Sequence, residues 1–178
     1  MPERSVAAAE EKLRVRARLT VLPDLREIAP AVDEAVRAAV GPHQPSLCPG
    51  VDELRLALTE ALNNVVEHSG HPPEQMIEVC VGDHEGLLHV CIEDAGKPLP
   101  TSLLDESEPP AEPEIGTPQG LEALQEGGWG WMLIRSTTAG LTYRRQAGRN
   151  RLCLAFSPET LKPAVGNVVA FPKPGCAG

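Results

Sequence analysis

The sequence is poor in several features, and each scarcity excludes a class of protein. Aromatic residues make up 3% of the 178 residues against a hydrophobic content of 42%, so the core has to be built from aliphatic side chains. No apolar run is long enough to cross a bilayer, and residues 1–12 lack the basic-then-apolar order of a signal peptide. A net charge of -9 argues against a nucleic-acid partner, because no basic patch would survive that background. We therefore expect one cytoplasmic domain with no membrane and no nucleic-acid partner.

Closely spaced pairs of cysteines, such as C-x-x-C, are also missing from the sequence. The chain has 5 Cys, an odd number, and no C-x-x-C pair. Scattered cysteines of this kind are typical of free thiols in a reducing cytoplasm rather than of disulfides or zinc ligands. We expect Cys80 and Cys91 to be small apolar fillers that share one face of a strand pair.

The first part of the chain has the spacing of one strand followed by two helices. Residues 13–21 alternate apolar and polar side chains, which predicts a half-buried strand. Residues 22–41 and 51–69 carry apolar side chains at helical spacing, with a possible kink at Pro30 and a Pro- and Gly-rich loop at 41–50. The side chains expected to face the core are Leu13, Val15, Ala17, Leu19 and Val21 in the strand, Leu25, Ile28, Val32, Ala35, Val36 and Ala39 in the first helix, and Val51, Leu54, Leu58, Leu62 or Ala61, and Val65 in the second.

The rest of the chain predicts two hairpins separated by a long irregular segment. Apolar stretches at 76–81 and 87–94 flank the link "GDHEG", and stretches at 141–146 and 149–156 form a second hairpin. Two consecutive hairpins make a largely antiparallel sheet whose one face the helices must cover. We therefore predict an α+β fold, a two-layer sandwich with a mixed, mostly antiparallel sheet and helices on one face.

The irregular segment, 97–119, contains six prolines and an acidic cluster, so we expect a mobile loop inside the domain. Short helices are expected at 120–128 and 130–140. The Pro- and Gly-rich tail from Ser157 is expected to be loosely held.

A row of polar residues on the second helix is the first candidate for chemistry. Glu60, Asn64 and His68 are each four residues apart and therefore stand in one stripe of a helix. A solvated helix face would carry such residues as well. A functional site would use the Asn oxygen as a hard neutral ligand for Mg²⁺ and the Glu to orient or deprotonate a hydroxyl beside the ion.

Two further segments carry weaker signals. Asp94 ends an apolar strand and could accept a hydrogen bond from an exocyclic amine such as that of adenine, while Gly96 would let the backbone pass close to a flat base; a strand-ending turn has the same residues. Gly128 and Gly130 are expected to precede a helix. The backbone N–H groups at the start of that helix could bind an anion. Alternatively, the glycines could be only a flexible hinge before the helix. We expect Trp131 to pack in the core rather than on a base.

The order of these three signals resembles the GHKL, or Bergerat-type, ATP-binding fold. "EALNNVVEH" resembles the N box, "DAGKP" the D-x-G-x-G box, and "GGWGWMLIRSTTAGLTYRR…GRNRLCLAF" the glycine-rich segment and closing hairpin of the bacterial anti-sigma-factor serine kinases. The likeness covers residues 13–157. Residues 1–12 are left as a flexible N-terminus and 158–178 as a tail.

The resemblance implies roles for individual residues. Glu60 would be the general base, and Asn64 would bind Mg²⁺ and through it the phosphates of ATP, with His68 supporting it. Asp94 would bind the adenine amine. Gly96 would line the base pocket, Gly128 and Gly130 would meet the phosphates, and residues 97–125 would form the ATP lid.

The sequence departs from the family pattern in two places. Pro98 stands where the second glycine of the D-x-G-x-G box is expected, which should stiffen the pocket edge and could lower nucleotide affinity. The lid carries an acidic cluster that would lie near the negative charge of ATP or face a protein partner. The acidic residues concerned are Glu106, Glu108, Glu112 and Glu114.

The function implied is phosphoryl transfer from Mg-ATP to a serine of a STAS-domain anti-anti-sigma protein, with a sigma factor as the competing partner. Relatives of this kind are typically homodimers. The alternative is a non-catalytic partner-binding module of the same fold. A catalytic domain cut from a histidine kinase is a third possibility, which we rank last because no phospho-accepting helix pair precedes residue 13.

Overall fold

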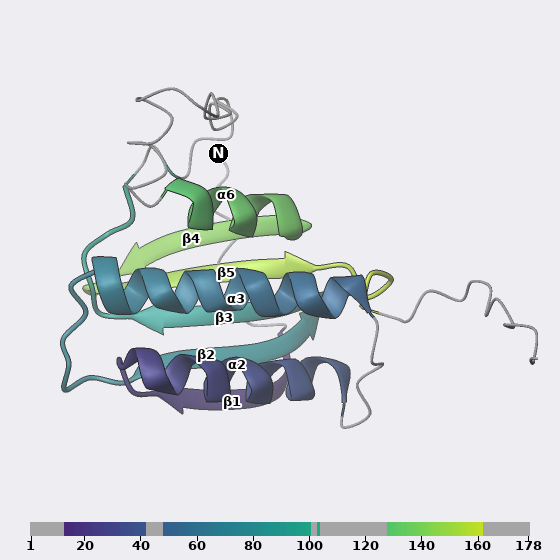
Figure 1. Cartoon of the computed structure of the whole chain (residues 1–178), viewed down its shortest axis with the longest axis horizontal. Coiled ribbons are helices and arrows are strands. Elements are labelled where there is room, and N and C mark those ends of the chain that lie inside the picture. Colours follow the sequence, from purple (N-terminus) through teal and green to yellow (C-terminus); the bar gives the residue numbers. More distant parts are fainter. Residues whose placement is uncertain (1–12, 42–47, 101–102, 104–127, 162–178) are drawn as a thin grey trace, which may run out of the picture.

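The computed structural model describes residues 13–41, 48–100, 103 and 128–161, and every structural statement below concerns these residues. Five antiparallel strands form one sheet in the order β1-β2-β3-β5-β4, and three helices lie on one of its faces (Figure 1). The predicted α+β two-layer sandwich is confirmed. The elements in chain order are β1 (Arg14–Val21), α2 (Leu25–Val40), α3 (Pro49–His68), β2 (Ile77–His84), β3 (Leu87–Asp94), α6 (Gly128–Thr137), β4 (Gly140–Gln146) and β5 (Arg149–Phe156).

The ends of α2 follow from local chemistry. The side chain of Asp24 accepts a hydrogen bond from the backbone N–H of Arg26 at 2.9 Å, which caps the first turn. Gly41 follows the last turn with φ 88°, a conformation that glycine adopts without strain. The predicted helix at 22–41 is therefore confirmed, with Pro30 inside it.

Both hairpins turn over two residues with positive φ. Glu85 and Gly86 have φ 49° and 81°, and Ala147 and Gly148 have φ 50° and 82°. Such turns match the twist of the flanking strands. The first hairpin is thus tighter than the predicted five-residue link, because the strand pairing continues through His84.

The core lies between the inner face of the sheet and the helices. Val79 is paired with Ile92 and Val81 with Val90, and all four side chains are buried. The apolar stripes of α2 and α3 pack onto this face. Leu25, which we expected in the core, is the first residue of α2 and is 49% exposed, so the buried stripe of this helix begins at Ile28.

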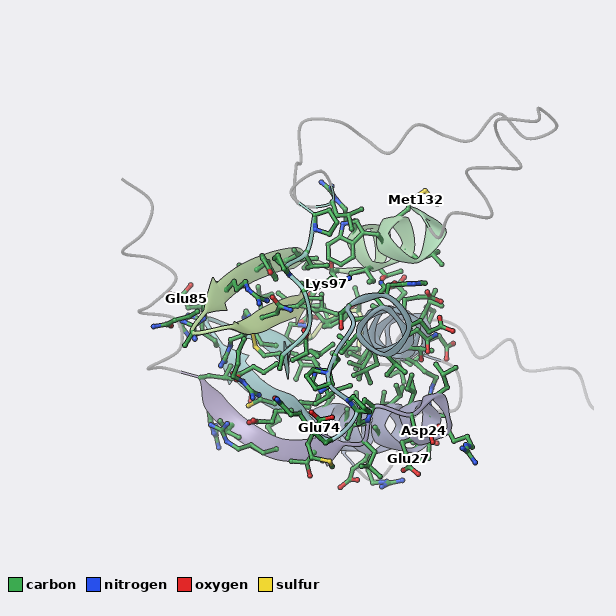
Figure 2. All side chains as sticks on the ribbon, turned by 90° about the vertical axis from the view of Figure 1, so that its left-hand side faces the viewer. Asp24, Glu27, Glu74, Glu85, Lys97 and Met132 are labelled. Carbon is green, nitrogen blue, oxygen red and sulfur yellow. A yellow bond between two sulfur atoms is a disulfide. The ribbon has the colours of Figure 1, made fainter. Side chains whose placement is uncertain are left out.

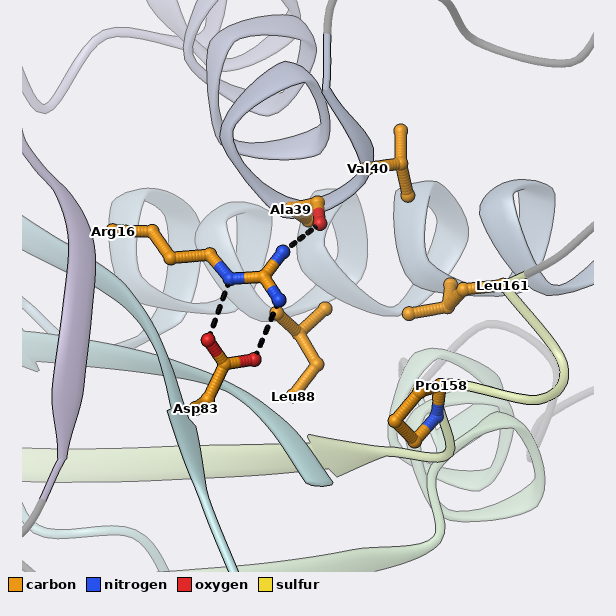
Figure 3. Close-up of a pocket in the computed structure, with 7 residues that line it drawn as sticks. All are labelled: Arg16, Ala39, Val40, Asp83, Leu88, Pro158 and Leu161. Atoms are coloured by element: carbon orange, nitrogen blue, oxygen red, sulfur yellow. Dashed lines mark hydrogen bonds and ion pairs between the residues drawn. The ribbon is translucent and has the colours of Figure 1, made fainter. Parts of the chain in front are cut away.

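The predicted alternation of β1 fails at its start. A register irregularity between Val15 and Ala17 turns Val15 outward, where it is 42% exposed. The same irregularity brings the side chain of Arg16 toward α2. Its guanidinium donates two hydrogen bonds of 2.7 Å to Asp83 and a further one to the carbonyl of Ala39 (Figure 3). Arg16 therefore fastens the C-terminal end of α2 to the first hairpin.

The expectation of free thiols is wrong for two cysteines. Cys91 of β3 and Cys153 of β5 form a disulfide, with their Cα atoms 4.0 Å apart. The pair arises because β3 and β5 are neighbours and their register places the two residues directly opposite each other. Cys48 and Cys80 are free and buried, and Cys176 lies outside the described residues.

The tail is not loosely held where it begins. Leu161 is buried, and the thiol of Cys48 donates a hydrogen bond to the carbonyl of Thr160 at 3.3 Å. Gly50 allows this approach, since a Cβ there would lie 2.1 Å from the Thr160 oxygen. Ser157–Leu161 therefore packs against the start of α3. No helix within the described ranges is long and apolar enough to cross a membrane.

Candidate functional site

The polar row predicted on the second helix lies on α3. Glu60 and Asn64 are half-buried, whereas His68 is exposed in the last turn. The side chains of Glu60 and Asn64 have no hydrogen-bond partner among the described residues. A half-buried carboxylate and amide one turn apart are not a fully solvated helix face.

Glu60 lies against the first turn of α6. A Cβ added at Gly130 would come within 2.5 Å of Oε2 of Glu60, so only a glycine leaves room for this carboxylate. The contact brings together the polar row of α3 and the glycine-rich segment, which are distant in the sequence. Both were predicted to belong to one site.

The glycines lie inside α6 rather than ahead of it, which corrects our prediction. Gly128 is the first residue of the helix and Gly130 lies in its first turn. The backbone N–H groups of a first helical turn have no partner within the helix, so those of Gly128 and Gly130 are not used by hydrogen bonds inside α6. Trp131 is buried and its indole N–H donates to the carbonyl of Leu103, which confirms its place in the core.

Asp94 ends β3 as a buried carboxylate with one oxygen engaged. Its side chain is 8% exposed. Oδ1 accepts hydrogen bonds from the backbone N–H of Gly96 at 2.7 Å and from Nδ2 of Asn150 at 2.9 Å. Oδ2 has no hydrogen-bond partner among the described residues. A buried acceptor in this state suits a ligand that brings its own N–H donor.

Asn150 is the centre of a network that the sequence did not reveal. Its Nδ2 also donates to the carbonyl of Lys97 at 2.9 Å, and its Oδ1 accepts from the hydroxyl of Tyr143 at 2.8 Å and from the guanidinium of Arg145 at 2.5 Å. Arg145 in addition donates to the carbonyl of Gly96 at 2.8 Å. This network holds the segment after β3 against the second hairpin. The only feature of the sequence that pointed to Asn150 was its place two residues after Gly148 in the closing hairpin, within the quoted segment "GRNRLCLAF".

His71 is a second residue that sequence reasoning missed. The ring is buried; its Nδ1 accepts from the backbone N–H of Ala95 at 3.0 Å and its Nε2 lies 3.0 Å from the carbonyl of Gln75. Since Nδ1 accepts, the proton is on Nε2 and the ring is neutral. The 4.0 Å separation between His71 and Asp94 is therefore not an ion pair. Nothing in the local sequence separates His71 from His68.

Gly96 is required by the protein itself. A Cβ there would lie 2.2 Å from Oγ and 2.5 Å from Cβ of Ser69, the residue that caps α3. The following backbone is held as well, because the N–H of Lys97 donates to the carbonyl of Ser69 at 2.7 Å and the N–H of Leu99 donates to the hydroxyl of Tyr143 at 3.1 Å. The predicted lid at 97–125 thus begins with fastened residues, and its remainder, apart from Leu103, lies outside the described ranges.

All these groups lie at one edge of the sandwich. The C-terminal end of α3, the segment after β3 and the start of α6 are at the left of Figure 1, and Figure 2 views this edge, with Lys97 labelled near α3. Three contacts join them: Glu60 with Gly130, Gly96 with Ser69, and Asp94 with Asn150. These contacts bring Glu60 beside Gly130 and hold Asp94 and Gly96 beside the C-terminal end of α3, whereas Asn64 and His68 are placed only by their positions on α3, where His68 is exposed.

No group of three or more His, Cys, Asp or Glu that could hold a metal ion occurs among the described residues. A magnesium ion here would depend on Asn64. Its half-buried amide offers one hard, neutral oxygen, which fits an ion that keeps most of its water and takes few protein ligands. Two small cavities lie elsewhere, one beside Arg16 and Leu161 and one on the open face of the sheet.

Comparison with known proteins agrees with this geometry. The family profile described as the histidine kinase-like ATPase domain matches residues 4–156. The chain is also similar to the serine-protein kinase RsbW of Oceanobacillus iheyensis, with 27% identity over 99 residues. That alignment covers 55% of this chain and 60% of the relative, so the chain matches less than two thirds of the relative's length.

Proposed function

The chain belongs to the histidine kinase-like ATPase family, and on that premise we propose that it is a protein serine kinase that uses Mg-ATP. Its substrate would be a serine of a STAS-domain anti-anti-sigma protein, and a sigma factor would be its alternate partner. The contact between Glu60 and Gly130 supports the proposal most directly, since the first turn of a helix is suited to bind phosphates and the carboxylate of Glu60 lies against that turn.

The base end of the proposed site is formed by Asp94. Oδ2, which no described residue binds, would accept a hydrogen bond from the adenine amine, while Oδ1 stays bound to Gly96 and Asn150. Gly96 would line the base. The N–H groups of Gly128 and Gly130 would receive the phosphates at the other end.

Asn64 would hold the magnesium ion, and His68 would support it from the next turn. When bound, the ion neutralises charge on the phosphates. Glu60 would accept the proton of the substrate serine hydroxyl, and its place against Gly130 limits how the carboxylate can turn. Phosphoryl transfer relies mainly on positioning and charge neutralisation, so these few side chains suffice.

The proposal extends to boundaries and assembly. The kinase domain would span 13–157, with 1–12 outside it, 97–125 as the ATP lid and 158–178 as a tail that begins packed on α3. Two copies would associate as a homodimer in the cytoplasm, which sedimentation of the purified chain can test.

A transfer assay tests the function. The full-length chain is incubated with labelled ATP, Mg²⁺ and a STAS-domain protein, and we expect label on a serine of the latter. Glu60→Gln keeps the size of the side chain but removes its charge and its ability to accept a proton, so it should retain ATP binding while transfer falls at least 100-fold. Asn64→Ala should lose the part of ATP binding that depends on Mg²⁺. The exposed Glu67→Gln on the same helix is a matched control and should behave as wild type.

The alternative is a non-catalytic partner-binding module. Pro98, exposed beside the base pocket, favours it, since proline lacks the N–H and the flexibility of the glycine expected there. Nucleotide binding without any transfer to a STAS protein, in wild type as in Glu60→Gln, would select this alternative. Normal transfer by Glu60→Gln would instead show that the assigned base is wrong.

A further inference from the structure

The open face of the sheet carries three cysteines in one row across three neighbouring strands. Cys80 of β2 is the register partner of Cys91 of β3, and Cys91 is the partner of Cys153 of β5. Directly opposite residues of antiparallel strands project to the same side of a sheet. That side faces away from the helices, because the adjacent residues Val79 and Ile92 are buried in the core.

The spacing within the row suits sulfur exchange. The Cα atoms of Cys91 and Cys153 are 4.0 Å apart, as in a non-hydrogen-bonded pair. The backbone N–H and C=O of Cys91 therefore point to β2 and form a hydrogen-bonded pair with Cys80, with Cα atoms about 5.5 Å apart. The free thiol of Cys80 thus lies beside the disulfide, on the side opposite to Cys153. A thiolate displaces a sulfur along the S–S axis, and the three residues follow one another across the strands in the order that such an attack requires.

Arg151 acts on both ends of the row, but its hydrogen bond is to the sulfur of Cys153. Nε of Arg151 donates a hydrogen bond to Sγ of Cys153 at 3.5 Å, so its guanidinium stabilises negative charge on that sulfur as it departs. At the other end, burial raises the pKa of the Cys80 thiol; Arg18 and Arg151 lower it in part, and Glu93 raises it further. Attack at Cys91 with departure of Cys153 is therefore the favoured direction, and it speeds up as the pH rises.

A cavity of about 190 Å³ gives access to the row. It is lined by both Cys80 and Cys91, together with charged side chains that include Arg18, Glu78 and Glu93. Cys80 and Cys91 are 8% and 3% exposed, so this cavity is the side from which we expect a small external thiol to approach the sulfur of Cys91.

We propose that Cys80, Cys91 and Cys153 form a thiol–disulfide exchange site in which the disulfide passes from Cys91–Cys153 to Cys80–Cys91. The Cys80 thiolate forms a bond to Sγ of Cys91 while the Cys91–Cys153 bond breaks, and the electron pair of that bond leaves on Cys153. The proton that Cys80 gives to water is replaced by one that Cys153 takes up. The step is therefore redox-neutral and needs no oxidant.

The exchange changes which strands are cross-linked near the proposed nucleotide site. The Cys91–Cys153 bond joins the strand that ends at Asp94 to the strand that carries Asn150, whereas a Cys80–Cys91 bond joins β3 to β2. An effect of the exchange on ATP binding rests on the proposed function, but the exchange itself does not.

Disulfide mapping of the full-length oxidised chain tests the exchange. The protein is shifted from pH 5 to pH 7, 8 or 9, quenched with N-ethylmaleimide at low pH, and digested without reductant by a protease that cleaves after glutamate. Glu85 and Glu126 then separate the three cysteines into different peptides. We expect the Cys80–Cys91 linkage to appear at a rate that rises about tenfold per pH unit, since one thiol must ionise.

Cysteine variants and an added thiol test whether Cys80 attacks the disulfide at Cys91. Cys80→Ser should keep only the Cys91–Cys153 linkage, and Cys48→Ser, which removes a buried thiol outside the row, should match wild type. Reduced glutathione added to Cys80→Ser should form its adduct on Cys91 and leave Cys153 to be alkylated. A wild-type chain with no Cys80–Cys91 linkage at any pH, an air-oxidised chain without the Cys91–Cys153 bond, or an adduct on Cys153 would overturn the proposal.

Discussion

Replacing Gly130 by alanine should separate the positioning of Glu60 from the stability of the fold. A Cβ at position 130 would lie 2.5 Å from Oε2 of Glu60 and 3.5 Å from its Cδ. The obstructing oxygen is the end of a flexible side chain, so the carboxylate turns away and the backbone stays in place. An ordinary contact needs about 3.5 Å, which requires the oxygen to move by about 1 Å.

The expected effects on stability and on catalysis have different sizes. Alanine is favoured over glycine in a helix by up to about 1 kcal/mol, so the free energy of unfolding should stay near that of wild type or rise slightly. A displacement of about 1 Å in a catalytic group can lower a rate about 100-fold. Gly130→Ala should therefore be stably folded and nearly inactive in phosphoryl transfer.

Urea unfolding and the transfer assay with labelled ATP measure the two quantities. Gly96→Ala is the matched contrast, because its Cβ would meet Oγ and Cβ of Ser69 at 2.2 and 2.5 Å, and that Cβ cannot rotate away. It should destabilise the fold by about 1–3 kcal/mol. Wild-type transfer by Gly130→Ala would refute the role given to Glu60, and a loss of stability as large as that of Gly96→Ala would refute the packing argument.

Three further changes test the network, the pH response and the disulfide. Asn150→Ala removes a buried donor from Asp94 and should lower the free energy of unfolding in urea by about 1–3 kcal/mol; a loss below about 0.5 kcal/mol would contradict the network. Burial lowers the pKa of His89 below its ordinary value near 6.5, so the unfolded state binds the proton first and stability should fall as the pH drops below that value. His89→Gln should flatten this slope in thermal melts between pH 7 and 5, and an unchanged slope would assign it to other groups. Reduction of the Cys91–Cys153 bond, whose residues are 62 apart in sequence, should lower the free energy of unfolding by at most about 4 kcal/mol; an unchanged urea midpoint would exclude a native disulfide.

Local pattern was sufficient for the elements that the structure describes and for their order, whereas the helix predicted at 120–128 lies almost wholly outside the described residues. Apolar spacing predicted α2 and α3, and the two-residue turns of both hairpins contain the glycines expected of them. Patterns of this kind are readable because each depends on neighbours within a few residues. The same reasoning failed at Val15, where an irregularity in strand pairing reversed the exposed face.

Contacts between distant segments explain what pattern reasoning missed. Asn150 and His71 could not be singled out, because their partners near Asp94 come from other parts of the chain. The disulfide likewise depends on β3 lying beside β5, a neighbour relation that no spacing of cysteines encodes.

The sequence by itself determined the α+β sandwich, the family resemblance and the residue types of the candidate site, since periodicity and motif order are properties of the chain. Only the tertiary structure decided that Glu60 meets Gly130, that Asp94 keeps one oxygen free, and that three cysteines share a row. Those facts depend on which strands pair and on how closely α3 approaches α6, and both are set by packing between residues far apart in the sequence.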